Sequence, residues 1–463
     1  MSAPDLTADV MHKFRESGAE KHSTIFLGAG ASTTSGLPDW NTFAKRLLVQ
    51  SGSVPNDAIA ELLVSRQDPL LVVEAARVAY NGKWEQKLRT ALYEGVNSME
   101  PSPLHRAAVA HLLGGELNDT SLVTLNFDPL LEQAIADETG TMPLSVVDGE
   151  YGDDEYVVHH LHGVITPQQT ESVVLTLSDF TDVIADPNAW QLSYLQAAVE
   201  RGALIIAGTS YRDPDVRQWL HHALPEKPSQ HAALVLLARQ GFALSKSEFS
   251  QAQKALSAQW SAIGLESVLL EDHSDAAQII QELRYIHGHG YLAPQERAVE
   301  VWRHHAERFD ELQTAYVQQL EVDAAVMKDA LGVDRLNLTL WLADGQGNLA
   351  RWAAQDRVYR DQEMLRSIET GHDSQWIAGQ ALGLDALLFK DLEVSGLRQW
   401  RSVLAIPVPV PHPSLPTFSA AVLTIGLPDA AERFEGSTML WGSPLARISD
   451  EWGERLCSVA FAK

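Results

Sequence analysis

The stretch TIFLGAGASTTSGLPDW, from Thr24 to Trp40, contains residue types that could bind a phosphate group. A strand-like apolar run ends in a Gly-Ala-Gly-Ala-Ser turn, where backbone N–H groups can face an anion and glycines allow its close approach. Taken alone, such a turn is more often a tight connection than a nucleotide site. The candidate ligand-binding residues of this stretch are Gly28, Ala29, Gly30, Ala31, Ser32, Pro38, Asp39 and Trp40.

Three further polar groups follow later strand-like runs. TLNFD carries Asn126 and Asp128, HLHG carries His162, and AGTSYRDPD carries a fourth set. Because the carboxyl ends of parallel strands open onto one crevice, we expect all four groups to meet at a single ligand. The fourth set consists of Gly208, Thr209, Ser210 and Asp213.

The elements that position these residues alternate between apolar strands and helical stretches over residues 1–290. This alternation predicts an α/β domain with a parallel, Rossmann-like sheet. The predicted strands are STIFLGAG, SLVTLNF, YVVHHLHG, SVVLTL, ALIIAGTS, HAALVLLA and ESVLLE.

The character of the chain changes after residue 290. Apolar residues at helical spacing predict one connecting or oligomerising helix, from about Arg297 to Leu331, within a linker of residues 291–331. Residues 332–463 then read as a smaller α+β domain, in which several strands are bracketed by helices.

The ordered set of motifs in the first domain resembles the sirtuin family. That family has a Gly-Ala-Gly-x-Ser loop, a Ser-Gly-Ile-Pro-Asp-Phe segment, a Thr-x-Asn-x-Asp strand end, a His-Gly pair and a Gly-Thr-Ser strand end. Sirtuin deacylases also carry a four-cysteine zinc module after the His-Gly pair, whereas here VITPQQTESVV runs straight on. The fold expected is therefore sirtuin-like without the zinc module, and without a metal. TLNFD and TSYRDPD look more like the sirtuin-like NAD hydrolases of bacterial antiphage defence.

The resemblance implies a reaction and a role for each residue. NAD would be the substrate, cleaved to nicotinamide and ADP-ribose through an oxocarbenium-like transition state. His162 would act as the base, a role suited to a side chain that titrates near neutrality. Asn126 would bind ribose or water, Asp128 would orient its neighbours, and Asp39 would lie near the nicotinamide. Asp128 and Asp213 could instead be helix caps.

Two other functions remain open. A sirtuin fold could sense NAD or ADP-ribose without turnover, although a pure sensor would need only the phosphate loop and not both Asn126 and His162. Protein deacylation is the third possibility, and the missing zinc module weakens it. His160 shares a strand face with His162, so it could support the site, but core packing is the simpler interpretation.

The second domain resembles a GAF domain in strand order and apolar pattern. That resemblance implies a sheet with a small-molecule pocket, which would restrain or trigger the hydrolase in response to a partner protein or a small molecule. It also implies association into a homo-oligomer. Four tryptophans could line the pocket or simply fill a core. They are Trp341, Trp352, Trp376 and Trp400.

Composition excludes several classes of protein. The formal charge is −26, from 35 Lys and Arg against 61 Asp and Glu, and no basic run is present, so direct nucleic-acid binding is not expected. The only cysteine, Cys457, forbids an intramolecular disulfide and a cysteine-based zinc site. No uncharged apolar run is long enough to span a bilayer. We therefore expect a cytoplasmic protein.

Overall fold

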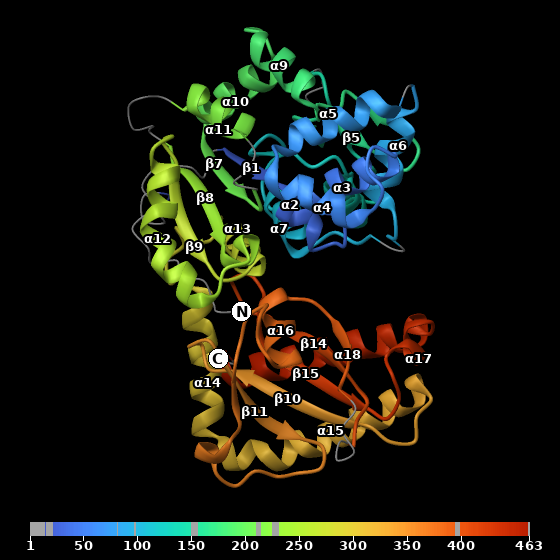
Figure 1. Cartoon of the computed structure of the whole chain (residues 1–463). Helices are drawn as coiled ribbons and strands as arrows, with labels where there is room; N and C mark the ends of the chain where they lie inside the picture. Colours follow the sequence, from blue (N-terminus) through green and yellow to red (C-terminus); the bar gives the residue numbers. More distant parts are fainter. Residues whose placement is uncertain are drawn as a thin grey trace. The chain divides into compact units, whose positions relative to one another are not determined.

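A computed structural model describes Phe14 and residues 22–80, 82–96, 99–149, 156–209, 214–224, 231–393 and 399–461. For residues 214–217 the backbone alone is described. The chain divides into two compact units, here called the N-terminal unit (Ala8–Arg284) and the C-terminal unit (from Tyr285). Each unit has its own sheet (Figure 1).

The N-terminal unit is built on a seven-stranded sheet in the order β3-β4-β2-β1-β7-β8-β9, with every pairing parallel. Its central strand β1 is buried along its whole length, as expected for a parallel strand covered on both faces. This confirms the predicted α/β class. The strands are β1 (Ser23–Leu27), β2 (Thr120–Thr124), β3 (Leu144–Val146), β4 (Val157–His160), β7 (Ala203–Ala207), β8 (Ala233–Ala238) and β9 (Glu266–Leu270).

Helices cover both faces of this sheet. One face packs its apolar side chains against α10 (Trp190–Arg201), α11 (Pro214–Ala223) and α12 (Lys246–Ser261). Helices α7 (Pro103–Leu113) and α13 (His273–Glu282) pack against each other and contact strands of the sheet. Helix α8 (Leu130–Thr139) follows β2.

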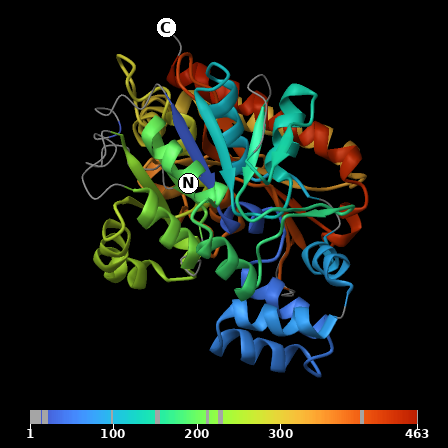
Figure 2. The same ribbon diagram turned by 90° about the horizontal axis from the view of Figure 1, so that it is seen from above.

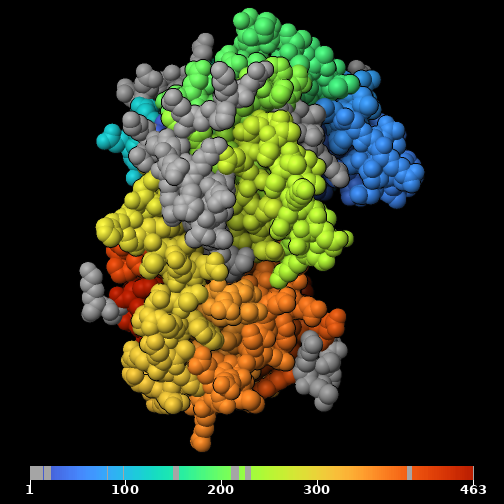
Figure 3. Space-filling view, turned by 90° about the vertical axis from the view of Figure 1, so that its left-hand side faces the viewer, coloured from blue at the N-terminus to red at the C-terminus, as the bar shows by residue number. Residues whose placement is uncertain are grey.

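A separate helical cluster is inserted between β1 and α7. Its helices share a core of leucine, valine, alanine and aromatic side chains, which also includes Phe127 from the loop after β2 and Leu130, the first residue of α8. Figure 2 shows the blue helices beside the sheet, and Figure 3 shows them as the blue protrusion on one face. The cluster contains α3 (Trp40–Gln50), α4 (Asp57–Arg66), α5 (Pro69–Tyr80) and α6 (Trp84–Tyr93).

One predicted strand of this unit is wrong. The segment SVVLTL (residues 172–177) forms no strand of the sheet. The two residues before it, Thr170–Glu171 (β6), pair with Val164–Ile165 (β5) in a small separate hairpin. Val174 and Leu175 are nevertheless buried, against the helices rather than between strands. Their apolar character reflects this packing. Helix α9 (Leu177–Ala185) follows directly.

The C-terminal unit contains a six-stranded antiparallel sheet in the order β12-β11-β10-β15-β14-β13. This sheet confirms the α+β class and is consistent with a GAF-like domain. Helix α16 (Ile377–Leu384) packs on one face, and α18 (Thr438–Ala460) packs on the other. The strands are β10 (Asn337–Ala343), β11 (Asn348–Ala354), β12 (Ser367–Glu369), β13 (Leu388–Asp391), β14 (Ser402–Val410) and β15 (Phe418–Leu427).

The single helix predicted over 297–331 is two helices, α14 (Pro294–Glu307) and α15 (Phe309–Leu331), which meet at Arg308. Their apolar faces belong to the core on the α18 side of the sheet, where Tyr316, Leu320 and Met327 are buried. These helices are therefore part of the C-terminal unit and not a free linker. Among the described helices, none combines the length and the apolar character needed to cross a bilayer.

Candidate functional site

The strand ends of the N-terminal unit are level with one another. Leu27, the last residue of β1, pairs with Thr124 of β2 and with Ala207 of β7, and Thr124 pairs with His160 of β4. The loops that leave these strands therefore begin at the same edge of the sheet. The polar groups that follow each strand therefore lie along one edge of the sheet, where ligands bind in open parallel sheets.

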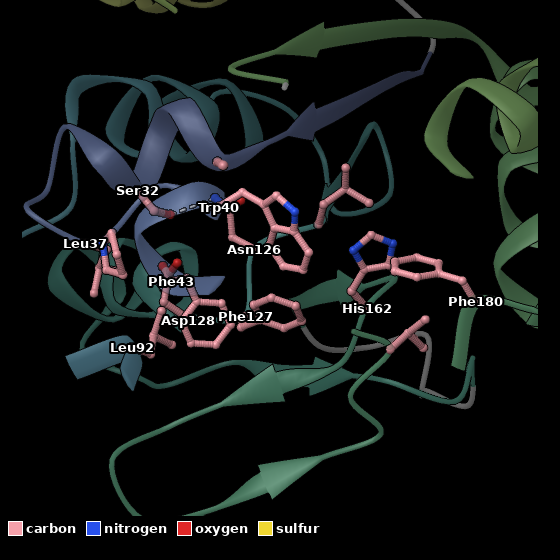
Figure 4. Close-up of a pocket in the computed structure, with 14 residues that line it drawn as sticks. Ser32, Leu37, Trp40, Phe43, Leu92, Asn126, Phe127, Asp128, His162 and Phe180 are labelled. Carbon is pink, nitrogen blue, oxygen red and sulfur yellow. Dashed lines mark hydrogen bonds between the residues drawn. The ribbon is translucent and has the colours of Figure 1, made fainter. Parts of the chain in front are cut away.

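A cavity lies at this edge. Aromatic and aliphatic side chains form most of its wall, and a few polar groups enter it, which is the usual character of a small-molecule site. Figure 4 shows Trp40, Asn126 and His162 facing the same space. The predicted site residues that line the cavity are Ala29, Ser32, Pro38, Trp40, Asn126, Asp128 and His162.

Asn126 is fixed by its own hydrogen bonds. Its Nδ2 donates to the carbonyl oxygen of Gly28 at 3.0 Å and to Ser32 Oγ at 2.7 Å. Because a carbonyl can only accept, the amide nitrogen faces Gly28 and the amide is oriented unambiguously. Both amide protons are therefore used by the protein, and Oδ1 is the amide atom available to accept a hydrogen bond from a ligand or water.

Asp128 lies beneath the same cavity, almost completely buried. Burial raises the pKa of its carboxyl, although hydrogen bonds from Ser32 and from the Leu130 N–H, together with the charge of His160, act in the opposite direction. The Leu130 N–H donates to Asp128 Oδ1 at 3.3 Å in an Asx turn that precedes α8, whose N-cap residue is Pro129. Asp128 therefore lines the cavity and also shapes the turn that leads into the helix.

His162 follows β4 and is buried among aromatic rings. Its ring centre lies 5.3 Å from that of Phe180, 5.6 Å from that of Trp219 and 6.3 Å from that of Phe127. The neighbouring Gly163 has φ +80°, and a Cβ there would lie 2.4 Å from two carbonyl oxygens. The His-Gly pair is therefore a turn that only glycine allows, and it sets the direction of His162.

The glycine-rich loop differs from the expected anion cradle. The N–H groups of Gly28, Gly30 and Ala31 donate to the carbonyls of Ala207, Gly208 and Gly28 at 2.7–3.0 Å, so they are not turned towards a ligand. The glycines serve close packing instead. A Cβ on Gly28 would lie 2.6 Å from the Cα of Thr209, and one on Gly30 would lie 2.8 Å from the His273 ring.

Some predicted residues lie elsewhere. Asp39 does not line the cavity, and its carboxylate accepts from the Thr42 N–H at 2.8 Å as the cap of α3. Gly208 and Thr209 contact the glycine-rich loop, and Thr209 Oγ1 is buried with no partner among the described residues. Ser210 and Asp213 lie outside the described residues.

Sequence reasoning missed two side chains near the site. His273, at the start of α13, contacts Gly30 through its ring. Glu132 of α8 is buried and accepts from His160 Nε2 at 2.7 Å, while His160 Nδ1 lies 2.9 Å from the Asn126 carbonyl oxygen. Burial opposes charge on both partners, but their mutual attraction raises the pKa of His160 and lowers that of Glu132. Neither residue belongs to a recognisable motif.

A second cavity lies in the C-terminal unit on the α16 side of the sheet. Trp341, Trp376 and Trp400 line it, but Trp352 is completely buried on the opposite face among the α15 and α18 side chains. The pocket role suggested for Trp352 is therefore wrong, because alternation along β11 turns it the other way. Arg351, Arg366 and Lys390 also line this cavity.

No group of three or more His, Cys, Asp or Glu side chains that could hold a metal ion occurs among the described residues. The polar groups of the first cavity are instead arranged as hydrogen-bond donors and acceptors.

Residues 120–268 match the SIR2-like domain family. The match runs from β2 to β9 and so includes the Asn126, Asp128 and His162 loops. It supports a sirtuin-like fold for the N-terminal unit, and it relates this unit to NAD chemistry.

Three solved structures match parts of the chain, each with a TM-score below 0.5. A Sir2 enzyme, from work on the mechanism and regulation of Sir2 enzymes, is 14% identical, covering 61% of this chain and 99% of its own, with a TM-score of 0.32. Sir2Tm bound to a propionylated peptide is 14% identical, covering 59% and 98%, with a TM-score of 0.30. A Burkholderia vietnamiensis protein assigned as a GAF sensor is 17% identical, covering 36% and 94%, with a TM-score of 0.23. No curated protein matches the chain.

Proposed function

We propose that the N-terminal unit hydrolyses NAD to nicotinamide and ADP-ribose. The observation that carries this proposal is that Asn126, Asp128 and His162, which come from two separate loops, line one largely apolar cavity. The SIR2-like match makes NAD the natural ligand of such a cavity. The combination of an amide, a carboxyl and an imidazole exceeds what binding alone requires.

The chemistry of the bond suits these groups. When the bond between ribose and nicotinamide breaks, its electron pair returns to the pyridinium nitrogen and the sugar develops oxocarbenium character. Asp128 would stabilise that positive charge from below, as a fixed charge in a site poor in water. Asn126 Oδ1 would accept a hydrogen bond from one O–H of the attacking water and so orient its oxygen towards the sugar. His162 would accept the proton that the water releases.

The apolar wall has a part in the same scheme. Trp40, Phe127 and Phe180 line the cavity beside His162 and can hold the flat nicotinamide ring. Excluding bulk water from this space strengthens the electrostatic contribution of Asp128. Thr209 Oγ1, buried without a partner among the described residues, is the candidate donor for the phosphate region.

The test is chromatography of NAD incubated with the full chain and with His162→Ala. We expect nicotinamide and ADP-ribose in equal amounts from the native protein and a loss of at least about 100-fold in His162→Ala. His222→Ala is the matched control, since His222 is an exposed histidine of α11. Intact NAD with retained binding would favour a sensor. Release of an acyl group from an acyl-lysine peptide would revive deacylation.

We also propose that the C-terminal unit gates this activity. Its cavity presents three tryptophans, three cationic side chains and the two acidic residues Asp391 and Glu393, and Arg351 Nε is buried without a partner among the described residues. This chemistry suits an anionic molecule with a flat ring. Hydrolysis that starts only when extract of infected cells is added would support gating, and equal rates with and without extract would contradict it.

The role in antiphage defence rests on the motif resemblance. Cells that express the native chain should lose NAD on infection and form fewer phage plaques, whereas cells with His162→Ala should do neither. Equal plaque counts in the two strains would overturn the defence role without bearing on the hydrolysis itself.

The predicted homo-oligomer no longer has the helix of residues 297–331 as support, because the apolar faces of α14 and α15 are used within the unit. The elution volume of the purified chain would decide it.

A further inference from the structure

A buried hydrogen-bonded chain connects the floor of the cavity to α8. Glu132 accepts from His160, His160 contacts the Asn126 carbonyl, and Asn126 donates to Ser32. Ser32 in turn hydrogen-bonds to Asp128. His160 and Glu132 are 0% and 1% exposed, and they do not line the cavity themselves. They act on the cavity only through Asn126 and Asp128.

The partners of His160 decide its protonation. The Asn126 carbonyl oxygen, 2.9 Å from Nδ1, can only accept a hydrogen bond, so Nδ1 carries a proton. Glu132 Oε1 lies 2.7 Å from Nε2 and also accepts from Ser145 Oγ. The contact between His160 and Glu132 raises the pKa of His160 and lowers that of Glu132, the directions that favour an imidazolium paired with a carboxylate.

The other titratable groups around this pair are uncharged. His105 lies close enough to Glu132 to interact with it, yet burial lowers the pKa of His105 to about 3. Burial likewise lowers the pKa of His159, next to His160, to about 4. Tyr93 interacts with Asp128 and Glu132, and burial raises its pKa. His160, Glu132 and Asp128 are therefore the groups of this cluster that can carry charge at neutral pH, and burial raises the pKa of the Asp128 carboxyl above its ordinary value.

We infer that His160 is a positioning residue: as an imidazolium it holds the Asn126 carbonyl and neutralises Glu132, so that Asp128 supplies the net negative charge beneath the cavity. This inference rests on the proposed hydrolysis, in which Asp128 faces a developing positive charge. Without His160, two carboxylates would share a buried site, and one of them would take up a proton.

Two variants separate these effects. His160→Gln removes the cation and leaves both carboxylates. Glu132→Gln removes the anion, and a neutral His160 can still donate from Nδ1 to Asn126 while accepting from the glutamine amide at Nε2. Only in His160→Gln does Asp128 therefore face a Glu132 carboxylate whose charge is not compensated. His159→Gln is the matched control, because His159 is the buried, neutral neighbour on the same strand.

The first measurement does not depend on activity. Nitrogen-15 NMR of histidine-labelled protein at pH 8 should show one histidine with both ring nitrogens protonated. That signal should be missing in His160→Gln and should become a singly protonated one in Glu132→Gln. A His160 with a bare ring nitrogen in the native protein would overturn the inference. If His160→Gln does not fold, Glu132→Gln still identifies the signal.

The second measurement is the pH dependence of kcat for NAD hydrolysis. The acidic limb should move upward by about 1 to 3 pH units in His160→Gln, because the Asp128 carboxyl then needs a higher pH to ionise. It should stay in place in Glu132→Gln and in His159→Gln. Superimposable profiles for His160→Gln and His159→Gln would overturn the inference. If the native chain releases no nicotinamide at any pH, the proposed function fails, and the NMR result still decides the state of His160.

Discussion

The side-chain amide of Asn126 donates to the Gly28 carbonyl at 3.0 Å and to Ser32 Oγ at 2.7 Å, and so joins the loop after β2 to the loop after β1. These two loops are separated by more than 90 residues along the chain. The amide that we propose to orient water is therefore also a structural bond between the two sides of the cavity.

Asn126→Ala should abolish hydrolysis and also lower stability, because it leaves Ser32 Oγ without its donor and removes one of the two hydrogen bonds that the Gly28 carbonyl accepts. We expect a loss of about 1–3 kcal/mol from the free energy of unfolding of the N-terminal unit, the usual cost of unsatisfied buried groups. Denaturation followed by circular dichroism measures the loss. Asn126→Asp should be as inactive, because a carboxylate oxygen would face the Gly28 carbonyl. An Asn126→Ala protein with native stability would contradict the bridging role.

Substitution of the loop glycines tests packing against ligand contact. A Cβ on Gly28 would meet backbone atoms of Gly208 and Thr209 at 2.6–2.7 Å, whereas one on Gly30 would first meet the movable ring of His273. Gly28→Ala should therefore destabilise the unit more than Gly30→Ala, which we expect to cost about 1–3 kcal/mol. Gly436→Ala is the control, since its Cβ would meet nothing within 4 Å.

The double variant Gly30→Ala, His273→Ala distinguishes the two explanations. If the ring of His273 is what Gly30 must avoid, its removal should restore part of the lost melting temperature. A melting temperature that stays low in the double variant would point to the Gly208 backbone instead, 3.0 Å from the same Cβ.

The order of the strand-end motifs was enough to predict the α/β class and the convergence of Asn126, Asp128 and His162. Both follow from local apolar runs and from the geometry of parallel sheets. The cap formed by Asp39 and the internal bonds of the Gly28–Ala31 loop could not be predicted, because side-chain and backbone partners depend on how loops pack. The same holds for Glu132 and His273, which tertiary packing brings to the site.

The C-terminal unit shows a different limit. Trp341 and Trp352 lie on neighbouring antiparallel strands, and only the register of β10 with β11, which shifts between Leu340 and Trp341, decides which face each one occupies. One lines the cavity and the other fills the core. Sequence spacing alone does not contain that register.

Acid should destabilise the N-terminal unit through two buried histidines of α7. Burial lowers the pKa of both His105 and His111 to about 3, from the ordinary value of 6.5. In the unfolded chain these two histidines are therefore protonated below about pH 6.5, whereas in the folded chain they stay neutral down to about pH 3. Stability that is complete above pH 6.5 is lost as the pH falls, by about 1.4 kcal/mol per pH unit for each group.

Urea denaturation at pH 7, 6 and 5 measures this loss. His111→Gln should reduce the dependence of the unfolding free energy on pH by about 1.4 kcal/mol per unit below pH 6, whatever its effect at pH 7. An unchanged slope in His111→Gln would show that this histidine is not kept neutral by the fold.

The cavity of the C-terminal unit should distinguish anionic from neutral ligands. Arg366 lies over the Trp376 ring, with its Cζ 4.6 Å from the ring centre, and Arg351 and Lys390 line the same space. A phosphate can pair with these cations while a flat base stacks on an indole, so AMP should quench tryptophan fluorescence with at least about tenfold higher affinity than adenosine.

Arg366→Glu should remove that preference because it places a negative charge beside the phosphate. Arg447→Glu is the control, since Arg447 is an exposed residue of α18 that does not line this cavity. If the native chain binds AMP and adenosine equally well, the cavity does not select anions. The same conclusion follows if Arg366→Glu and Arg447→Glu bind AMP equally well.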